Sequence, residues 1–120
     1  MTKHNTVIVV RKPPLGSVDA FEAMRLALSF YAAGAPVALL FEGPGTLNWV
    51  SGIAGPDVLA QSVSRLVTDI ARFKIPAYVI SEDLAESGFT PSDLASQHPF
   101  LIPRSDVSSM LTAYDSVVAV

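Results

Sequence analysis

The sequence predicts an α/β protein: a three-layer α/β/α domain over residues 1–120 with a mostly parallel five-stranded sheet. The chain has 120 residues, half of them hydrophobic, which is enough for one domain with a packed core. Short segments that are apolar throughout recur along it, as expected for strands buried on both faces. Segments between them carry apolar residues three and four positions apart, which is typical of helices that cover such a sheet.

The first two strands and the helix between them are expected in the first third of the chain. The segments 7–10 and 37–41 are continuous apolar runs, the first of them β-branched, and both predict buried strands. Ser17 is the expected N-cap of the intervening helix, and Gly34 ends it. The apolar face of this helix is expected to consist of Val18, Phe21, Met24, Leu28 and Tyr31.

A second helix has the clearest periodicity in the chain. Its apolar residues are Leu59, Val63, Leu66, Ile70 and Phe73. Pro56 suits the first turn of this helix, because the ring fixes a helical φ and the missing N–H is not needed there. Pro76 closes the helix and opens a third apolar strand over residues 77–80.

The last third of the chain predicts shorter elements. A short helix is expected over residues 82–89, a turn over 90–93 and a brief strand over 100–102. Ser105 is expected to cap a last helix, and residues 117–120 form the fifth strand. The apolar residues of that last helix are Val107, Met110, Leu111 and Tyr114.

Composition excludes several classes of function. The formal net charge is -3, and the basic residues form no run longer than Arg11-Lys12, so a nucleic acid partner is not expected. The chain has no cysteine, which removes thiolate metal sites, thiol nucleophiles and persulfide carriage. Only 16% of the residues are charged, against about 25% in average domains. This shortfall predicts an oligomer in which other subunits cover part of the surface.

The sequence also indicates a cytoplasmic protein without a membrane segment. The polar stretch 1–6 lacks the basic and apolar regions of a secretory signal. Residues 26–41 are uncharged, but Gly34 and Pro36 interrupt them, and a spanning helix needs about 20 continuous apolar residues.

Parallel strands place the loops that leave their carboxyl ends at one edge of the sheet, where ligands bind in folds of this kind. The candidate pocket residues in these loops are Arg11, Pro14, Gly16, Ser17, Glu42, Gly43, Gly45, Ser81 and Glu82. Arg11 and Lys12 stand before a helix N-terminus, which favours a small anion. A rigid turn, stiffened by Pro13 and Pro14, is the competing explanation.

No catalytic residue, metal ligand or cofactor site is predicted. Glu82, Asp83 and Glu86 are an acidic cluster, but acids in a first helical turn are explained by the helix dipole without a catalytic role. His4 and His98 lack the spacing of metal ligands.

The loop over residues 46–54 is unusually apolar. Leu47, Trp49, Val50 and Ile53 are candidates for contact with a partner. The alternative, a loop packed on its own domain, explains the same composition, and the sequence leaves both open.

Several short motifs resemble the DsrE/DsrF-like family, and most closely its DsrF/TusC branch. They are an Arg-x-Pro-Pro-x-Gly turn after the first strand, a Gly-x-Gly turn after the second and a Phe-x-Ile-x-Ala-Tyr-Val run into the third. The residues that carry the resemblance are, in order, Arg11, Pro14, Gly16, Phe41, Gly45, Phe73, Tyr78, Val79, Leu84, Gly88, Tyr114 and Asp115. The resemblance spans nearly the whole chain and implies a DsrE-like domain of flavodoxin-like architecture.

The resemblance also implies a role in sulfur relay, for tRNA thiolation or sulfur oxidation, within homo- or hetero-oligomers, trimers or hexamers, of DsrE-like subunits. In the DsrE/TusD branch a cysteine just after the third strand carries a persulfide, whereas residues 78–82 contain none. The leading hypothesis is therefore a non-catalytic DsrF/TusC-like subunit that supports assembly or docks a thiol-bearing sulfur carrier. The alternative is a homo-oligomeric protein of the same fold that binds a small molecule or anion.

Overall fold

The computed structural model describes residues 3–120 and contains a five-stranded sheet in the order β4-β3-β2-β1-β5. The strands are β1 (Thr6–Val10), β2 (Val37–Phe41), β3 (Ala77–Ile80), β4 (Phe100–Ile102) and β5 (Ser116–Ala119). Each neighbouring pair is parallel. The predicted α/β class is confirmed, and the sheet is parallel throughout.

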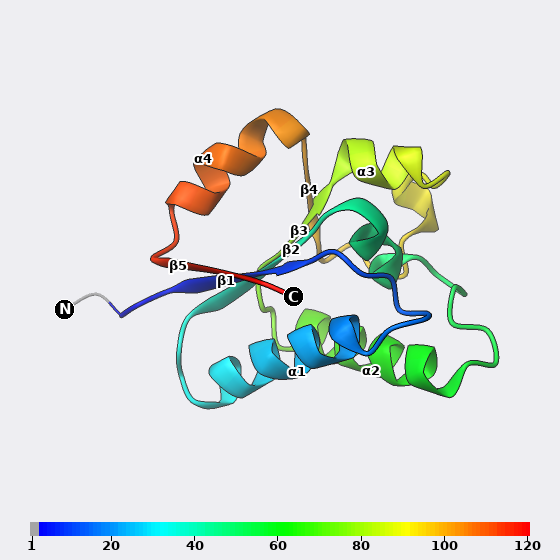
Figure 1. Cartoon of the computed structure of the whole chain (residues 1–120), viewed down its shortest axis with the longest axis horizontal. Helices are drawn as coiled ribbons and strands as arrows, with labels where there is room; N and C mark the ends of the chain where they lie inside the picture. The colour runs from blue at the N-terminus through cyan, green and yellow to red at the C-terminus, as the bar shows by residue number, and fades with distance from the viewer. Residues whose placement is uncertain (1–2) are drawn as a thin grey trace.

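Helices cover the sheet on both sides, so the predicted three layers are confirmed. The helices are α1 (Asp19–Ala32), α2 (Val58–Arg72), α3 (Ser81–Glu86) and α4 (Val107–Thr112), with 3-10 segments η1 (Gly43–Trp49), η2 (Pro91–Asp93) and η3 (Arg104–Asp106). Helices α1 and α2 lie side by side beneath the sheet, and α4 lies on the opposite side (Figure 1). None of the helices within residues 3–120 has the length and apolarity needed to cross a membrane. Met1 and Thr2, at the start of the polar N-terminal stretch, lie outside the described residues.

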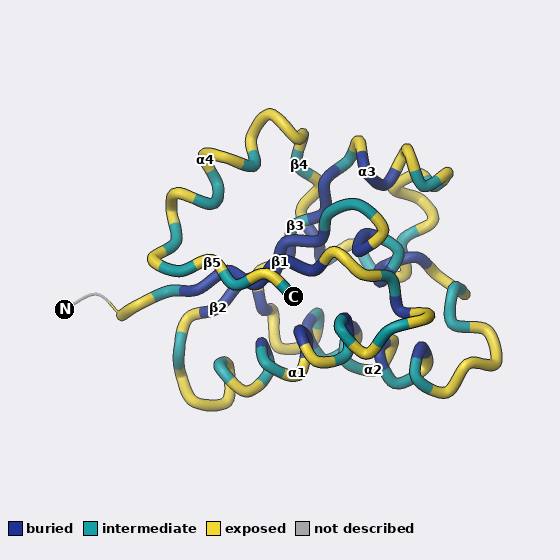
Figure 2. The backbone as a smooth tube through the Cα atoms, viewed as in Figure 1, coloured by how far each residue is buried: buried dark blue, intermediate teal, exposed yellow. Residues whose placement is uncertain are grey.

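Alternation along the central strands divides the core into two parts. Ile8 and Leu39 point to the side of α1 and α2 and belong to the larger cluster. Val7 and Leu40 point to the other side, where α4 packs with Val107, Met110 and Leu111. Strands β1 and β2 are buried along their whole length (Figure 2). This explains why their sequences are apolar without alternation.

The outer strands differ from the prediction that all five are buried on both faces. Phe100 in β4 is 60% exposed and Val117 in β5 is 50% exposed. Both strands are at the edges of the sheet, so each has a neighbour on one side only. These two strands are as apolar as the central strands, but their side chains are exposed because the strands lie at the edges of the sheet.

The predicted apolar face of α1 is confirmed in part, since Phe21 and Leu28 are half-buried and pack against the core. Among its five residues Met24 is fully buried, whereas Val18 and Tyr31 are exposed. The buried positions are instead the small residues Ala20, Ala23 and Ala27. Small side chains let the helix approach the sheet closely, so the larger side chains lie beside this contact rather than in it. Tyr31 stacks on Phe73 at the end of α2, with ring centroids 5.1 Å apart.

Three helix starts also differ from the predictions. Asp57 caps α2 and accepts a hydrogen bond from the Ala60 N–H at 2.7 Å, so Pro56 precedes the helix. The α1 helix begins at Asp19, whose N–H donates to Ser17 Oγ at 3.1 Å, while the N-cap position is Val18. Ser105 lies in η3 and does not cap α4, which begins after Asp106.

Candidate functional site

Charged side chains converge where four parallel strands end. Arg11 follows β1, Glu42 follows β2, Asp83 lies in α3 directly after β3, and Arg104 follows β4. Together with Gly43, Pro44 and Glu86 these residues line a pocket with a volume of about 340 Å³. The sheet topology therefore gathers residues that are up to 93 positions apart in sequence (Arg11 to Arg104).

Asp83 is the central residue of this pocket. Its side chain is 6% exposed, and its Oδ2 accepts a hydrogen bond from the Gly43 N–H at 2.7 Å. Its Oδ1 pairs with Nη2 of Arg104, which also lies 3.6 Å from Oε1 of Glu86. A buried carboxylate requires such partners, because an isolated buried charge is strongly unfavourable. Asp83 thus fixes the loops after β2 and β4 against α3.

The other basic side chain of the pocket is also paired. Nε of Arg11 forms an ion pair with Oε1 of Glu42, whose own N–H donates to Val10 O at 3.1 Å. The lining therefore has two guanidinium groups and three carboxylates, with each guanidinium bound to an acid. The three carboxylates outnumber the two guanidinium groups, so the lining has no excess of positive charge. Within residues 3–120, His, Asp and Glu form no group of three that could hold a metal ion.

Ser81 and Glu82, both candidate pocket residues, join α3 to the end of β4. Ser81 Oγ donates to Ile102 O at 3.1 Å. Both carboxylate oxygens of Glu82 accept from the Arg104 N–H, at 2.9 and 3.1 Å. These backbone hydrogen bonds hold the pKa of Glu82 below its ordinary value of 4.5. The two side chains therefore hold the start of α3 against the end of β4, next to the pocket, and do not line the pocket itself.

The lowered pKa of Glu82 predicts a pH-dependent contribution to stability. The contribution is fully present above pH 4.5, the ordinary value, and is lost as the pH falls through the lower pKa of the folded state. Replacing Glu82 with Gln is expected to lower the free energy of unfolding at pH 7 and to have a smaller effect in strong acid. Urea titrations of both proteins at pH 7 and in strong acid measure this difference. Glu22→Gln, on the exposed side of α1, is the control, and an equal loss at both pH values would contradict the assignment.

The remaining candidate pocket residues lie apart from the charged cluster. Pro14 is buried, and Gly16 has φ +84 in the turn before Ser17, whose hydroxyl accepts from the start of α1. Gly45 is buried against the backbone of β1. The structure thus brings Arg11, Glu42 and Gly43 together and places the other six residues outside the lining of the pocket.

Four residues of the pocket are absent from the set predicted for it. The sequence explains Asp83 and Glu86 by the helix dipole alone, and it places Pro44 within the Gly-x-Gly turn after the second strand. Arg104 belongs to no local motif, but its place two residues after the fourth strand is a usable signal, since strand ends share one edge.

The apolar loop packs mainly on its own domain. Trp49 is 0% exposed and meets Phe41 edge to face, with ring centroids 5.7 Å apart. Val50 is buried as well, while Leu47 and Ile53 are half-buried and pack against the same cluster. Trp49 and Val50 are therefore core residues in the isolated chain, as the alternative explanation of this loop held.

The sheet and the helices that cover it define an α/β protein with an all-parallel, five-stranded sheet, and solved structures share this fold. Among the solved structures that match, the crystal structure of the ychN protein from E. coli has a TM-score of 0.78 over 98% of this chain and 99% of that chain. The two sequences are 17% identical, so the likeness concerns the fold. No family model matches the sequence, and no curated protein matches it.

Proposed function

We propose that this chain is a non-catalytic, DsrF/TusC-like subunit of a sulfur-transfer assembly. The observation that carries the proposal is the residue directly after β3, where the DsrE/TusD branch of the family that this sequence resembles has its persulfide cysteine. Here it is Ser81, whose hydroxyl is engaged with Ile102 O. A serine oxygen does not form the sulfur–sulfur bond of a persulfide, so the subunit would act by holding a partner that has the thiol.

The surface of the chain supports a role in assembly. Phe100 and Leu101 on β4 and Val117 on β5 are large apolar side chains exposed on the two edges of the sheet. Exposed strand edges pair readily with other chains unless they are protected. The low content of charged residues, 16%, agrees with a surface that is partly covered by other subunits.

The strand-end pocket supports docking of a protein more than binding of a free anion. The guanidinium groups of Arg11 and Arg104 already face the carboxylates of Glu42, Asp83 and Glu86, so the pocket offers a free anion no excess of positive charge. A partner surface that has both charges can contact the same groups without breaking these pairs. The anion-binding alternative therefore lacks comparable support.

We expect the purified protein to be a trimer or larger, alone or with DsrE-like subunits from its own cells. Phe100→Glu is expected to shift the assembly towards the monomer, because a charge at a buried interface is unfavourable. Size-exclusion chromatography with light scattering measures the mass, and native mass spectrometry identifies any partner. Val58→Glu is the control, since Val58 is 75% exposed at the start of α2, away from both sheet edges.

The result also separates the two parts of the proposal. A complex with a DsrE-like subunit that has a cysteine after its third strand supports the role in sulfur transfer. A homo-oligomer that co-purifies with no such subunit supports the role in assembly and contradicts the role in sulfur transfer. A monomer without partners, both alone and in material from its own cells, overturns the proposal.

A further inference from the structure

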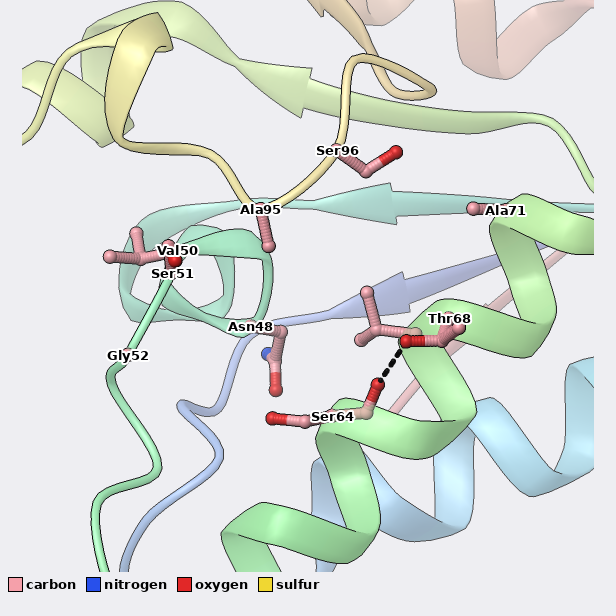
Figure 3. Close-up of a pocket in the computed structure, with 10 residues that line it drawn as sticks. Asn48, Val50, Ser51, Gly52, Ser64, Thr68, Ala71, Ala95 and Ser96 are labelled. Carbon is pink, nitrogen blue, oxygen red and sulfur yellow. Dashed lines mark hydrogen bonds between the residues drawn. The ribbon is translucent and has the colours of Figure 1, made fainter.

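A second cavity lies away from the strand ends and has no residue in common with the charged pocket. Its volume is about 360 Å³. The end of η1, one face of α2 and the segment that leads to β4 surround it, and Figure 3 shows their side chains around a common space. Its polar lining residues are Asn48, Ser51, Ser64, Thr68 and Ser96.

The orientation of the Asn48 amide is fixed by its surroundings. Its Nδ2 donates to Lys12 O at 2.9 Å and to Gly45 O at 2.8 Å. Because both partners are carbonyl oxygens, a flipped amide would place an acceptor against two acceptors. The oxygen Oδ1 must therefore stay on the other side of the amide, towards the cavity.

Oδ1 of Asn48 is buried and has no hydrogen-bond donor within residues 3–120. The residue is 5% exposed, and Figure 3 shows the oxygen turned towards Ser64 on α2. A buried acceptor without a donor is costly and uncommon. This atom thus marks the place where a bound molecule would donate a hydrogen bond.

The residues that line the cavity indicate the charge and polarity of the rest of that molecule. All lining residues are uncharged, in contrast to the charged pocket. Val67 and Ala71 form an apolar surface on α2 beside the hydroxyl groups. The Thr68 hydroxyl donates to Ser64 O at 3.0 Å, so it is already used within the helix. A charged molecule would lose its hydration here without a counter-charge in the lining.

We propose that this cavity binds a small neutral molecule that has an amide or hydroxyl donor next to an apolar ring or chain. The donor bonds to Asn48 Oδ1, and the apolar part packs on Val67 and Ala71. The volume is at the lower end of the range of about 300–1,000 Å³ for ligand sites, so the molecule is small. The inference is independent of the proposed role in sulfur transfer.

Benzamide and benzoate are a matched pair of probes for this site. Benzamide is neutral and donates N–H groups, whereas benzoate has the same ring, is charged and has no donor at neutral pH. In titrations followed by amide NMR, benzamide is expected to shift the resonances of residues that line the cavity. Benzoate is expected to bind at least about tenfold more weakly, since it leaves Oδ1 without a donor. Equal binding of both probes, or shifts confined to other regions, would overturn the proposal.

Substitution on the exposed face of α2 tests the location without disturbing the hydrogen bonds of Asn48. Ser64→Leu places a larger side chain at the cavity and is expected to weaken benzamide binding at least about tenfold. Ser62→Leu is the matched control, because residues two positions apart face different directions on a helix. Thermal unfolding verifies that both variants fold. If a crystal grown with benzamide holds only water at Oδ1 and the titration shows no shift, the cavity is not a ligand site.

Discussion

Replacement of Gly45 by alanine is expected to lower the free energy of unfolding by about 3 kcal/mol or more, at the upper end of the range for overpacking. A Cβ atom at this position would lie 2.0 Å from Val10 O and 2.8 Å from Val10 C. Both atoms belong to the backbone of β1, which is hydrogen-bonded to β2 on one side and β5 on the other. The strand cannot move away without breaking the centre of the sheet.

Urea denaturation followed by circular dichroism measures this loss, and Gly52→Ala is the matched control. Gly52 has φ +75 but no heavy atom within 4 Å of an added Cβ. Alanine there is expected to cost roughly 1–2 kcal/mol from the left-handed backbone alone. An equal loss in both variants would mean that the steric contact with Val10 does not exist in solution.

The central strands could be predicted from the sequence because burial on both faces requires an apolar residue at every position. Residues 7–10 and 37–41 are covered on both faces, so every position is apolar and the runs match β1 and β2 closely. The same apolar pattern predicted the strand β4 but not the exposure of its side chains. Whether a strand is central or at an edge depends on the order of strands in the sheet, which no local pattern contains.

The face of α1 shows a second limit of periodicity. Spacing and size favour Phe21, Leu28 and Tyr31, of which the first two are half-buried against the core and Tyr31 is exposed. The residues in closest contact with the sheet are the fully buried Ala20, Ala23 and Ala27. Alanine is apolar but contributes little to an amphipathic pattern. The alanines were missed because the packing distance between helix and sheet, as well as hydrophobicity, decides which residues face the sheet.

The sequence could predict where the candidate site lies but not which of its side chains pair with one another. The rule that strand ends share one edge led to Arg11, Glu42 and Gly43. The ion pairs that organise the pocket join Asp83 to Arg104 across 21 positions, and this choice of partners is a property of the folded chain. The unpaired oxygen of Asn48 is also invisible in sequence, because it follows from two distant carbonyl groups.

Replacement of Trp49 by alanine is expected to lower the free energy of unfolding by about 3–5 kcal/mol, the range for a large aromatic removed from a core. The side chain is fully buried and its ring packs against Phe41. Proteins of this size are stable by about 5–15 kcal/mol, so the variant would retain a much smaller margin. Guanidinium denaturation followed by circular dichroism measures the change.

Two further variants separate core packing from a role in partner contact. Trp49→Phe keeps an aromatic ring against Phe41 and removes the indole Nε1, a buried donor without a partner within residues 3–120. It is therefore expected to cost clearly less than Trp49→Ala. Phe73→Ala removes an aromatic that is 38% exposed and should cost less as well. If Trp49→Ala unfolds at the denaturant concentration of the unmodified protein but reduces its assembly, the side chain faces a partner and the loop does not pack as described here.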